Sequence, residues 1–443
     1  MDIRPGSGEG LAAGRLVMTS SPFETGQAAG AAAARTSAAN NGVSTEIRVG
    51  LLCCLVLVLE GYDLGAMAFT LPALTDAWHL KPVAFTSALV AGSLGLFVGS
   101  FLCGMLGDRL GRKPVMMGAV ALFGLTAFLT AMTRDPFWLS VTRFLTGLGI
   151  GGGIPTTIAL LSDLARPGKQ GGLVIASMCG VQIGNVLCGL AASRLIAHLG
   201  WQAVFILGGL MPLFILPVLA LWLPETFTAQ KQAGLASVPL LFKGRLARLT
   251  LILWLVNFLS LLTIYSVNSW LPSLLHSMGI VTSSAVLAAS MFQMGGLAGC
   301  LTSAPLANRF GTENVVAVLL AIGGCFLILL GLAHGTAFLF AVLAFGAGLG
   351  ISTGQVGINA LSGAVYPKEL RGTGAGWALG VGRMGNITGP LFGGLLLALG
   401  WHPGPILLLM AVPAFGLTSA LLVLRQVRAH TSAASAPLTE QPA

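Results

Sequence analysis

Long apolar segments, one after another, limit the folds open to this chain more than any other feature. Between residues 48 and 425 the sequence contains twelve predominantly apolar runs, each near the roughly 20 residues that a helix needs to span a bilayer. Charged residues make up 8% of the 443, whereas soluble domains carry about 25%. This composition excludes a soluble enzyme, a nucleic-acid-binding protein and a disordered chain. It predicts an all-α membrane protein with twelve transmembrane helices.

The predicted transmembrane segments form two groups of six. The first group lies at residues 48–71, 85–106, 114–133, 137–162, 172–197 and 203–223. The second group lies at residues 249–275, 284–306, 314–333, 336–362, 373–399 and 405–425. We therefore expect an N-terminal half over 47–223 and a C-terminal half over 249–425, joined by a cytoplasmic loop at 224–248. Residues 1–46 and 426–443 are expected to be disordered tails, and Met18 is as good an initiator as Met1.

Basic residues are concentrated in alternate connections between the predicted helices. With the N-terminus placed inside, 18 of the 23 Lys and Arg residues fall on the cytoplasmic side, which is the asymmetry that the positive-inside rule describes. The sequence therefore predicts a multi-pass protein of the cell (inner) membrane with both termini in the cytoplasm. The same distribution accounts for the net charge of +9 without a nucleic-acid partner.

The two groups of helices are also related in sequence. At an offset of 200 residues several residues coincide, namely Leu71-Pro72 with Leu271-Pro272, Arg109 and Gly111 with Arg309 and Gly311, and Gly200-Trp201 with Gly400-Trp401. Two parallel halves related by an axis along the membrane normal place a substrate site between them, near the middle of the bilayer. We therefore expect two pseudo-symmetric six-helix halves and transport by alternating access.

Two acidic residues lie within the first predicted helix. Glu60 and Asp63 are three residues apart, so both carboxyl groups lie on one helix face. Charged groups within the bilayer cost at least about 2.5–3.5 kcal/mol on insertion scales and are functional candidates for that reason. Two neighbouring carboxylates in a low dielectric are not expected both to be ionised, so the pair predicts a site that takes up and releases a proton. The alternative is that one acid only pairs with an arginine and holds the bundle together.

Two arginines lie within predicted helices. Arg383 is surrounded by small residues in G-V-G-R-M-G-N, and its planar fork can bind a carboxylate through two hydrogen bonds. We interpret it as the anchor of a substrate carboxylate, with an ion pair to Glu60 or Asp63 as the alternative. Arg143 is expected to pair with Asp63 or to assist proton movement, although its side chain would also reach the outer interface.

Other polar and aromatic residues on the C-terminal helices are candidates for contact with the rest of the substrate. Tyr265 and Asn268 share one helix face and are suited to bind a ring hydroxyl group. The further candidates are Gln293, Gln355, Asn359, Trp377 and Asn386, each of which could equally form hydrogen bonds or contacts between helices. Trp270 is expected at the membrane interface. No metal-ligand spacing is present, and no cofactor is expected.

The connection between the second and third predicted helices carries a glycine-rich basic motif. Its residues are Gly107, Asp108, Arg109, Gly111, Arg112 and Lys113. Glycine permits a tight turn there, and the charged groups can bond to helix ends in one state and release them in another. We interpret the motif as a conformational switch, with a plain basic loop that sets topology as the alternative.

Several of these motifs resemble those of a known family. G-D-R-L-G-R-K-P at 107–114 and R-F-L-T-G-L-G from Arg143 are similar to motifs of the major facilitator superfamily. L-E-G-Y-D in the first helix, the stretch 360–394 and W-L-P-E-T at 222–226 resemble the aromatic acid:proton symporter family. The resemblance covers residues 48 to 425. It implies uptake of a small aromatic carboxylate together with protons. We expect the protein to be a monomer.

The resemblance also implies roles for particular residues. By it, Glu60 and Asp63 are needed for uptake, and Arg383 helps to bind the anion. Many members have an aspartate where this chain has Glu60. The glutamate at position 60, together with residues 178–184 and 265–272, is similar to the 3-(3-hydroxyphenyl)propionate transporters. The expected substrate is therefore of the hydroxyphenylpropionate or hydroxybenzoate type.

Two other functions remain open from the sequence. A proton-driven exporter of drugs or organic anions shares the basic loop motif, but exporters usually carry a Gly-Pro motif in the fifth helix. Here Gly389-Pro390 lies in the eleventh helix instead. A membrane sensor for aromatic acids would need a signalling domain or partner, and the tails contain no sequence of that kind. A membrane enzyme is not expected, because no nucleophile or metal-ligand pattern appears.

Overall fold

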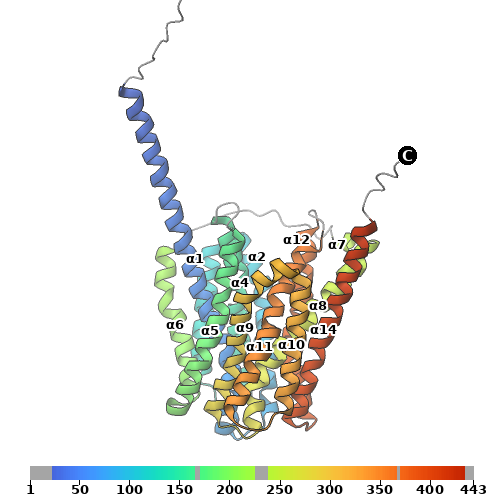
Figure 1. Ribbon diagram of the computed structural model, residues 1–443. Helices are drawn as coiled ribbons and strands as arrows, with labels where there is room; N and C mark the ends of the chain where they lie inside the picture. The colour runs from blue at the N-terminus through green and yellow to red at the C-terminus, as the bar shows by residue number, and fades with distance from the viewer. Residues whose placement is uncertain (1–21, 165–169, 225–237, 367–369, 435–443) are drawn as a thin grey trace, which may run out of the picture. The chain divides into compact units, whose positions relative to one another are not determined.

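The computed structural model describes residues 22–164, 170–224, 238–366 and 370–434. The chain divides into two units, Met1–Arg48 and Val49–Ala443, and the helix bundle belongs to the second. All regular structure in the described residues is helical (Figure 1).

Each predicted transmembrane segment corresponds to a helix or a pair of consecutive helices. In the N-terminal half these are α1 (Pro22–Trp78), α2 (Thr86–Leu110), α3 (Arg112–Thr130), α4 (Pro136–Leu164), α5 (Gln170–Leu199) and α6 (Gln202–Trp222). In the C-terminal half they are α8 (Arg245–Ser277), α9 (Thr282–Phe310), α10 (Thr312–Leu332), α11 (Ala337–Ala364), the pair α12 (Arg371–Gly382) and α13 (Met384–Ala398), and α14 (Pro403–Ala434). Two short elements, η1 (Pro82–Phe85) and α7 (Val238–Leu241), complete the order.

The structure corrects the expected extent of the tails. Residues 22–46 form the first part of α1 instead of a disordered tail, and residues 426–434 continue α14. Both segments are rich in alanine, the residue with the highest helix propensity. Residues 1–21 and 435–443, and most of the expected central loop at 225–237, lie outside the described residues.

The eleventh predicted segment is divided at Arg383, where one continuous helix was expected. The amide of Asn386 bonds to the carbonyl oxygen of Arg383, three residues back, at 3.1 Å. Such tighter turns within a helix often mark functional or strained positions. The break lies among glycines, at Gly382 and Gly385, and upstream of Pro390, which has no amide hydrogen to donate.

Large apolar side chains cover the outside of the bundle. Among the described residues, ten helices are long and apolar enough to cross a membrane. Phe214 and Leu221 of α6, for example, are exposed, as expected for residues that face lipid tails. The chain is therefore a multi-pass membrane protein, as the hydropathy predicted.

The backbone repeats at the same offset as the sequence. Gly111 and Gly311 have φ angles of 92° and 84°, and Gly200 and Gly400 have φ angles of 81° and 76°. At each pair the chain ends one helix and begins the next in a left-handed conformation that favours glycine. His79, at φ 54°, corresponds in the same way to Gly279, at φ 92°.

The two halves share a hydrophobic core at one end of the bundle only. At the end where α1 and α8 finish, which is the lower end in Figure 1, one buried cluster contains residues of both halves, including Phe69, Phe85, Trp270 and Phe292. Towards the other end each half has a separate buried cluster. We call the end with the shared core the closed end.

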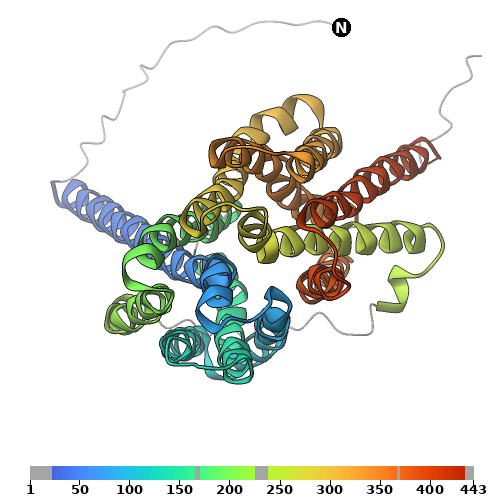
Figure 2. The same cartoon turned by 90° about the horizontal axis from the view of Figure 1, so that it is seen from below.

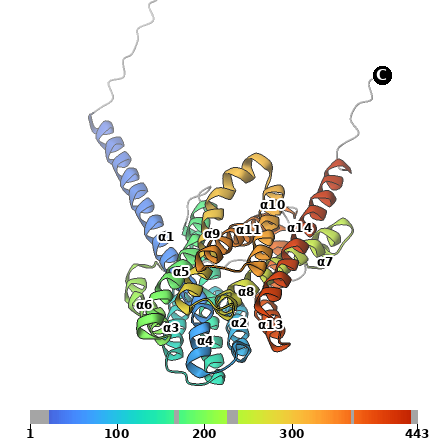
Figure 3. The same cartoon turned by 60° about the horizontal axis from the view of Figure 1, so that its bottom comes forward.

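Several helix contacts join the halves. Helix α5 lies along α9, and α13 lies beside η1 and α2 (Figures 2 and 3). Trp270, expected at the membrane interface, is fully buried in the shared core, and its indole Nε1 donates to the carbonyl oxygen of Pro390 at 2.9 Å. The expectation was wrong because the indole finds its hydrogen-bond partner in a neighbouring helix instead of at the membrane surface.

Candidate functional site

A buried ion pair joins α1 to α4 in the N-terminal half. Nη1 of Arg143 lies 3.0 Å from Asp63 Oδ2, and Nη2 lies 3.4 Å from Asp63 Oδ1. Nη2 also donates to the hydroxyl groups of Thr130 and Thr146, at 3.2 and 2.8 Å. The guanidinium lies 5.0 Å from the ring centroid of Phe205. Arg143 therefore does not extend to the membrane interface, and its charge is matched by Asp63.

Glu60 lies apart from this ion pair. Its side chain is 1% exposed, and neither carboxyl oxygen has a hydrogen-bond partner in the part of the chain that is described. The carboxyl group lies against α4 at Gly153, where an added Cβ would overlap Oε1 of Glu60. The two acids of the first helix thus have different surroundings. One is matched by an arginine, and the other is enclosed without a cation.

Arg383 lies between α12 and α13, on the segment that packs against α8. Its Nη1 is buried and makes no hydrogen bond within the described ranges. The phenol of Tyr265 on α8 lies within electrostatic range of the guanidinium. Among the described residues no ion pair joins Arg383 to Glu60 or Asp63, because Asp63 is bound to Arg143 and neither oxygen of Glu60 has a partner there.

The other predicted site residues are distributed along the C-terminal half. Asn386, one turn after Arg383, is buried, and its Oδ1 has no hydrogen-bond partner among the residues described. Gln293 on α9 is buried, and Asn268 on α8 is half-buried. Trp377 on α12 is 40% exposed and stacks on Trp254 of α8, with ring centroids 6.1 Å apart. Trp377 thus belongs to an aromatic pair that the sequence analysis did not identify.

A polar chain links α8 to α11 in the C-terminal half. Ser260 donates to Oε1 of Gln355, and Nε2 of Gln355 donates to Oδ1 of Asn359 at 2.8 Å. Gln355 and Asn359 were candidates from sequence, but Ser260 was not. Its signal lay in the repeat, because Ser260 occupies the position that corresponds to Glu60. A neutral hydrogen-bonded group therefore replaces the buried acid in the second half.

The predicted switch motif lies at the turn between α2 and α3. Gly111 donates its amide to the carbonyl oxygen of Gly107 at 3.1 Å and has a φ of 92°. Arg109 is exposed, Arg112 is buried and Lys113 is half-buried. The side chain of Asp108 lies outside what is described. The turn geometry explains the need for Gly111, and a switching role for the motif remains a prediction.

Asp63 and Arg143 neutralise one another, whereas neither Glu60 on one half nor Arg383 on the other has an ion-pair partner among the described residues. A positive group with an unpaired buried donor favours an anion. A carboxyl group enclosed without a cation favours its neutral form, because burying an isolated charge is costly. The arrangement is suited to bind an anion and a proton at separate places.

Comparison with known proteins identifies a transporter family. The description Major Facilitator Superfamily applies to two matches, over residues 53–326 and 253–443. A gallate transporter of Pseudomonas putida is 33% identical over 420 residues, which cover 87% of this chain and 94% of the relative. A 3-(3-hydroxy-phenyl)propionate transporter of Escherichia coli (strain K12) is 39% identical over 355 residues, covering 79% and 86%.

The fold is similar to that of solved transporters. The structure of the xylose transporter XylE from E. coli in an inward open conformation superposes with a TM-score of 0.68 at 17% identity. The match covers 87% of this chain and 99% of the other. At this identity the likeness concerns the fold alone.

Proposed function

Since the chain belongs to the Major Facilitator Superfamily, we propose that it imports an aromatic carboxylate, of the hydroxyphenylpropionate or hydroxybenzoate type, together with a proton. As a member of this transporter superfamily the chain is not an enzyme. The names of its relatives, which include transporters of gallate and 3-(3-hydroxy-phenyl)propionate, support the substrate class.

The observation that carries the proposal is the state of Arg383. Its guanidinium has a buried donor without a partner in the described chain, while Arg143 is matched by Asp63. A substrate carboxylate supplies the missing acceptor, and the planar fork binds it through two hydrogen bonds. Tyr265, Asn268, Gln293, Trp377 and Asn386 are then the candidates for contact with the ring and its hydroxyl groups.

The surroundings of Glu60 support a proton-coupled mechanism. The neutral acid fits a site where neither oxygen has a partner, and the charged form requires water or a cation to enter. Glu60 therefore carries the transported proton, and it releases the proton when water reaches it. Asp63 and Arg143 hold α1 to α4 beside it, so the ion pair positions the helix that bears Glu60.

The arrangement of the cores supports transport by alternating access. The halves share a core at the closed end and have separate cores towards the other. Both termini and the turn containing Gly111 then face the cytoplasm, the closed end faces outwards, and the protein lies in the inner membrane as a monomer. In the opposite state the closed end separates, and the loop motif from Gly107 to Lys113 holds the cytoplasmic ends together.

Uptake by cells that express the protein tests the proposal. Radiolabelled 3-(3-hydroxyphenyl)propionate, 4-hydroxybenzoate and benzoate are each supplied with and without a protonophore. Accumulation of at least one acid, abolished by the protonophore, is the expected result. No accumulation of any acid by correctly inserted protein would contradict the proposal. Faster loss of a preloaded acid from expressing cells would indicate export instead.

A further inference from the structure

The two halves meet at the closed end through residues that occupy equivalent positions in the repeat. Asp76 lies near the end of α1 and His276 near the end of α8, 200 residues apart. Where two halves are related by a two-fold axis, equivalent residues can touch only at that axis. The contact of Asp76 with His276 therefore lies at the pseudo-two-fold axis of the bundle, where separation of the halves would break it.

Both ring nitrogens of His276 face hydrogen-bond acceptors. Nε2 lies 3.4 Å from Oδ1 of Asp76, and Nδ1 lies 3.1 Å from the carbonyl oxygen of Ile280. A neutral imidazole has one N–H group, whereas an imidazolium has two. Only the charged ring can donate to both acceptors at once. Protonated His276 can therefore donate to both acceptors, whereas the neutral ring can donate to only one of them.

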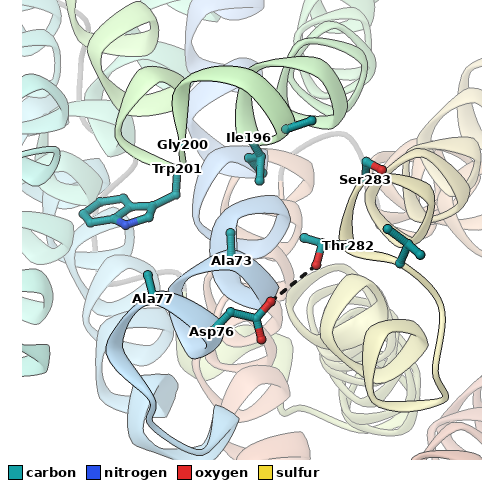
Figure 4. Close-up of a pocket in the computed structure, with 10 residues that line it drawn as sticks. Ala73, Asp76, Ala77, Ile196, Gly200, Trp201, Thr282 and Ser283 are labelled. Carbon is teal, nitrogen blue, oxygen red and sulfur yellow. Dashed lines mark hydrogen bonds between the residues drawn. The ribbon is translucent and has the colours of Figure 1, made fainter.

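Thr282, at the start of α9, binds the same carboxylate. Its Oγ1 lies 3.5 Å from Oδ2 of Asp76 (Figure 4) and 3.4 Å from Nδ1 of His276. The hydroxyl group can donate to Asp76 while the ring donates to Oδ1. These contacts connect α1 of one half to both α8 and α9 of the other.

The contact is open to water. The side chains of Asp76 and His276 are 59% and 28% exposed, and a cavity of about 500 Å³ lies beside them, lined by residues that include Asp76, Trp201 and Thr282 (Figure 4). The other titratable groups near this end of the bundle are His79, Lys81, Arg134, Asp135, Arg194, His198, His334 and His402. None of these is hydrogen-bonded or ion-paired to His276 in the described structure.

We propose that His276 is a proton-binding site on the outer face, and that its protonation latches the outer ends of the two halves together through Asp76 and Thr282. This inference takes one premise from the proposed function, namely that the closed end faces the outside of the cell. Loss of the proton removes one of the two donated hydrogen bonds and the attraction between the ring and the carboxylate. The outer ends then separate more easily.

Thiol labelling from outside measures this separation directly. Ser290 of α9 is buried against Gly189 of α5 in the contact between the halves, so Ser290→Cys should react with a membrane-impermeant maleimide only when the halves part. Labelling of intact cells is compared at external pH of about 5.5 and about 8, on either side of the range where imidazoles usually change charge. The parent chain, with its seven cysteines, is labelled in parallel as the blank.

We expect severalfold more labelling at the higher pH. In the Ser290→Cys background, His276→Asn should give high labelling at both values, and His276→Lys, which keeps a positive charge, low labelling at both. Asp76→Asn should also give high labelling, and His402→Asn, at an exposed histidine, should preserve the pH response. A normal pH response in His276→Asn would overturn the proposal. The readout needs no substrate, so failure of the aromatic-acid proposal would be recognised separately.

Discussion

Asp63 on α1 and Arg143 on α4 form a two-pronged buried ion pair, with distances of 3.0 and 3.4 Å. Nη2 of Arg143 also donates hydrogen bonds to the hydroxyl groups of Thr130 and Thr146, which hold the guanidinium in place. Because the charge of Arg143 is matched by Asp63, this arginine is not left to bind a substrate anion. The proposed function therefore assigns the substrate carboxylate to Arg383 and the proton to Glu60.

Breaking the ion pair should harm the fold as well as transport. Asp63→Asn leaves Arg143 charged and unmatched, and removal of one partner of a buried pair costs roughly 3–5 kcal/mol. We expect a lower melting temperature and loss of uptake. In the double variant Asp63→Asn/Arg143→Gln, much of the stability should return, because no unpaired charge remains. Thermal unfolding of detergent-purified protein measures this, and a double variant less stable than Asp63→Asn would contradict it.

Glu60→Gln should separate substrate movement from proton coupling. The amide has nearly the shape of the neutral acid but cannot lose a proton. Exchange of labelled for unlabelled substrate across the membrane should therefore continue, while accumulation driven by a proton gradient is lost. Proteoliposomes with and without an imposed pH gradient distinguish the two activities. Normal gradient-driven accumulation in this variant would exclude Glu60 as the proton carrier.

The enclosure of Glu60 by α4 leads to a prediction about a glycine. An added Cβ at Gly153 overlaps Oε1 of Glu60, so Gly153→Ala should displace the carboxyl group and reduce gradient-driven uptake. The matched control is Gly104→Ala on α2, where nothing lies within 4 Å of the added Cβ. Equal uptake rates in the two variants, at equal amounts of protein in the membrane, would show that the contact has no functional role.

The sequence predicted the architecture and indicated the pairing of Arg143 with Asp63, but not the other contacts of its polar residues. Hydropathy and the repeat indicated the helices and the halves, because both depend on local composition. The spacing of Glu60 and Asp63 fixes only the helix face they share. Arg143 was expected as a partner of Asp63, but the spacing does not indicate that Gly153 encloses Glu60. The contact of Asp76 with His276 depends on how the halves meet, which no local pattern specifies, although their 200-residue separation is a signal that the repeat contains.

Backbone strain at the turns of the closed end can be tested in isolation. Gly279 has a φ of 92°, and nothing lies within 4 Å of a Cβ added there, so Gly279→Ala changes only the backbone preference. A left-handed conformation costs a non-glycine residue roughly 1–2 kcal/mol, and we expect that loss of stability. His79, its counterpart in the repeat, already has a φ of 54°, so His79→Gly should raise stability. Unfolding measurements on the two purified variants should show a loss of stability for Gly279→Ala and a gain for His79→Gly.

Arg383 offers the most direct test of substrate recognition. Arg383→Gln removes the charged fork that the proposal assigns to the carboxylate, and charged hydrogen bonds of this kind contribute about 1.5–3 kcal/mol. The KM for uptake should therefore rise roughly 10- to 100-fold. Arg383→Lys should recover part of this loss, because Lys keeps the charge without the planar fork. The control is Arg194→Gln, at an exposed arginine on α5, which should leave KM unchanged. A neutral amide analogue of the substrate should bind weakly to the parent chain and lose little further affinity in Arg383→Gln. An equal loss of affinity for the acid and the amide would mean that Arg383 does not bind the carboxylate.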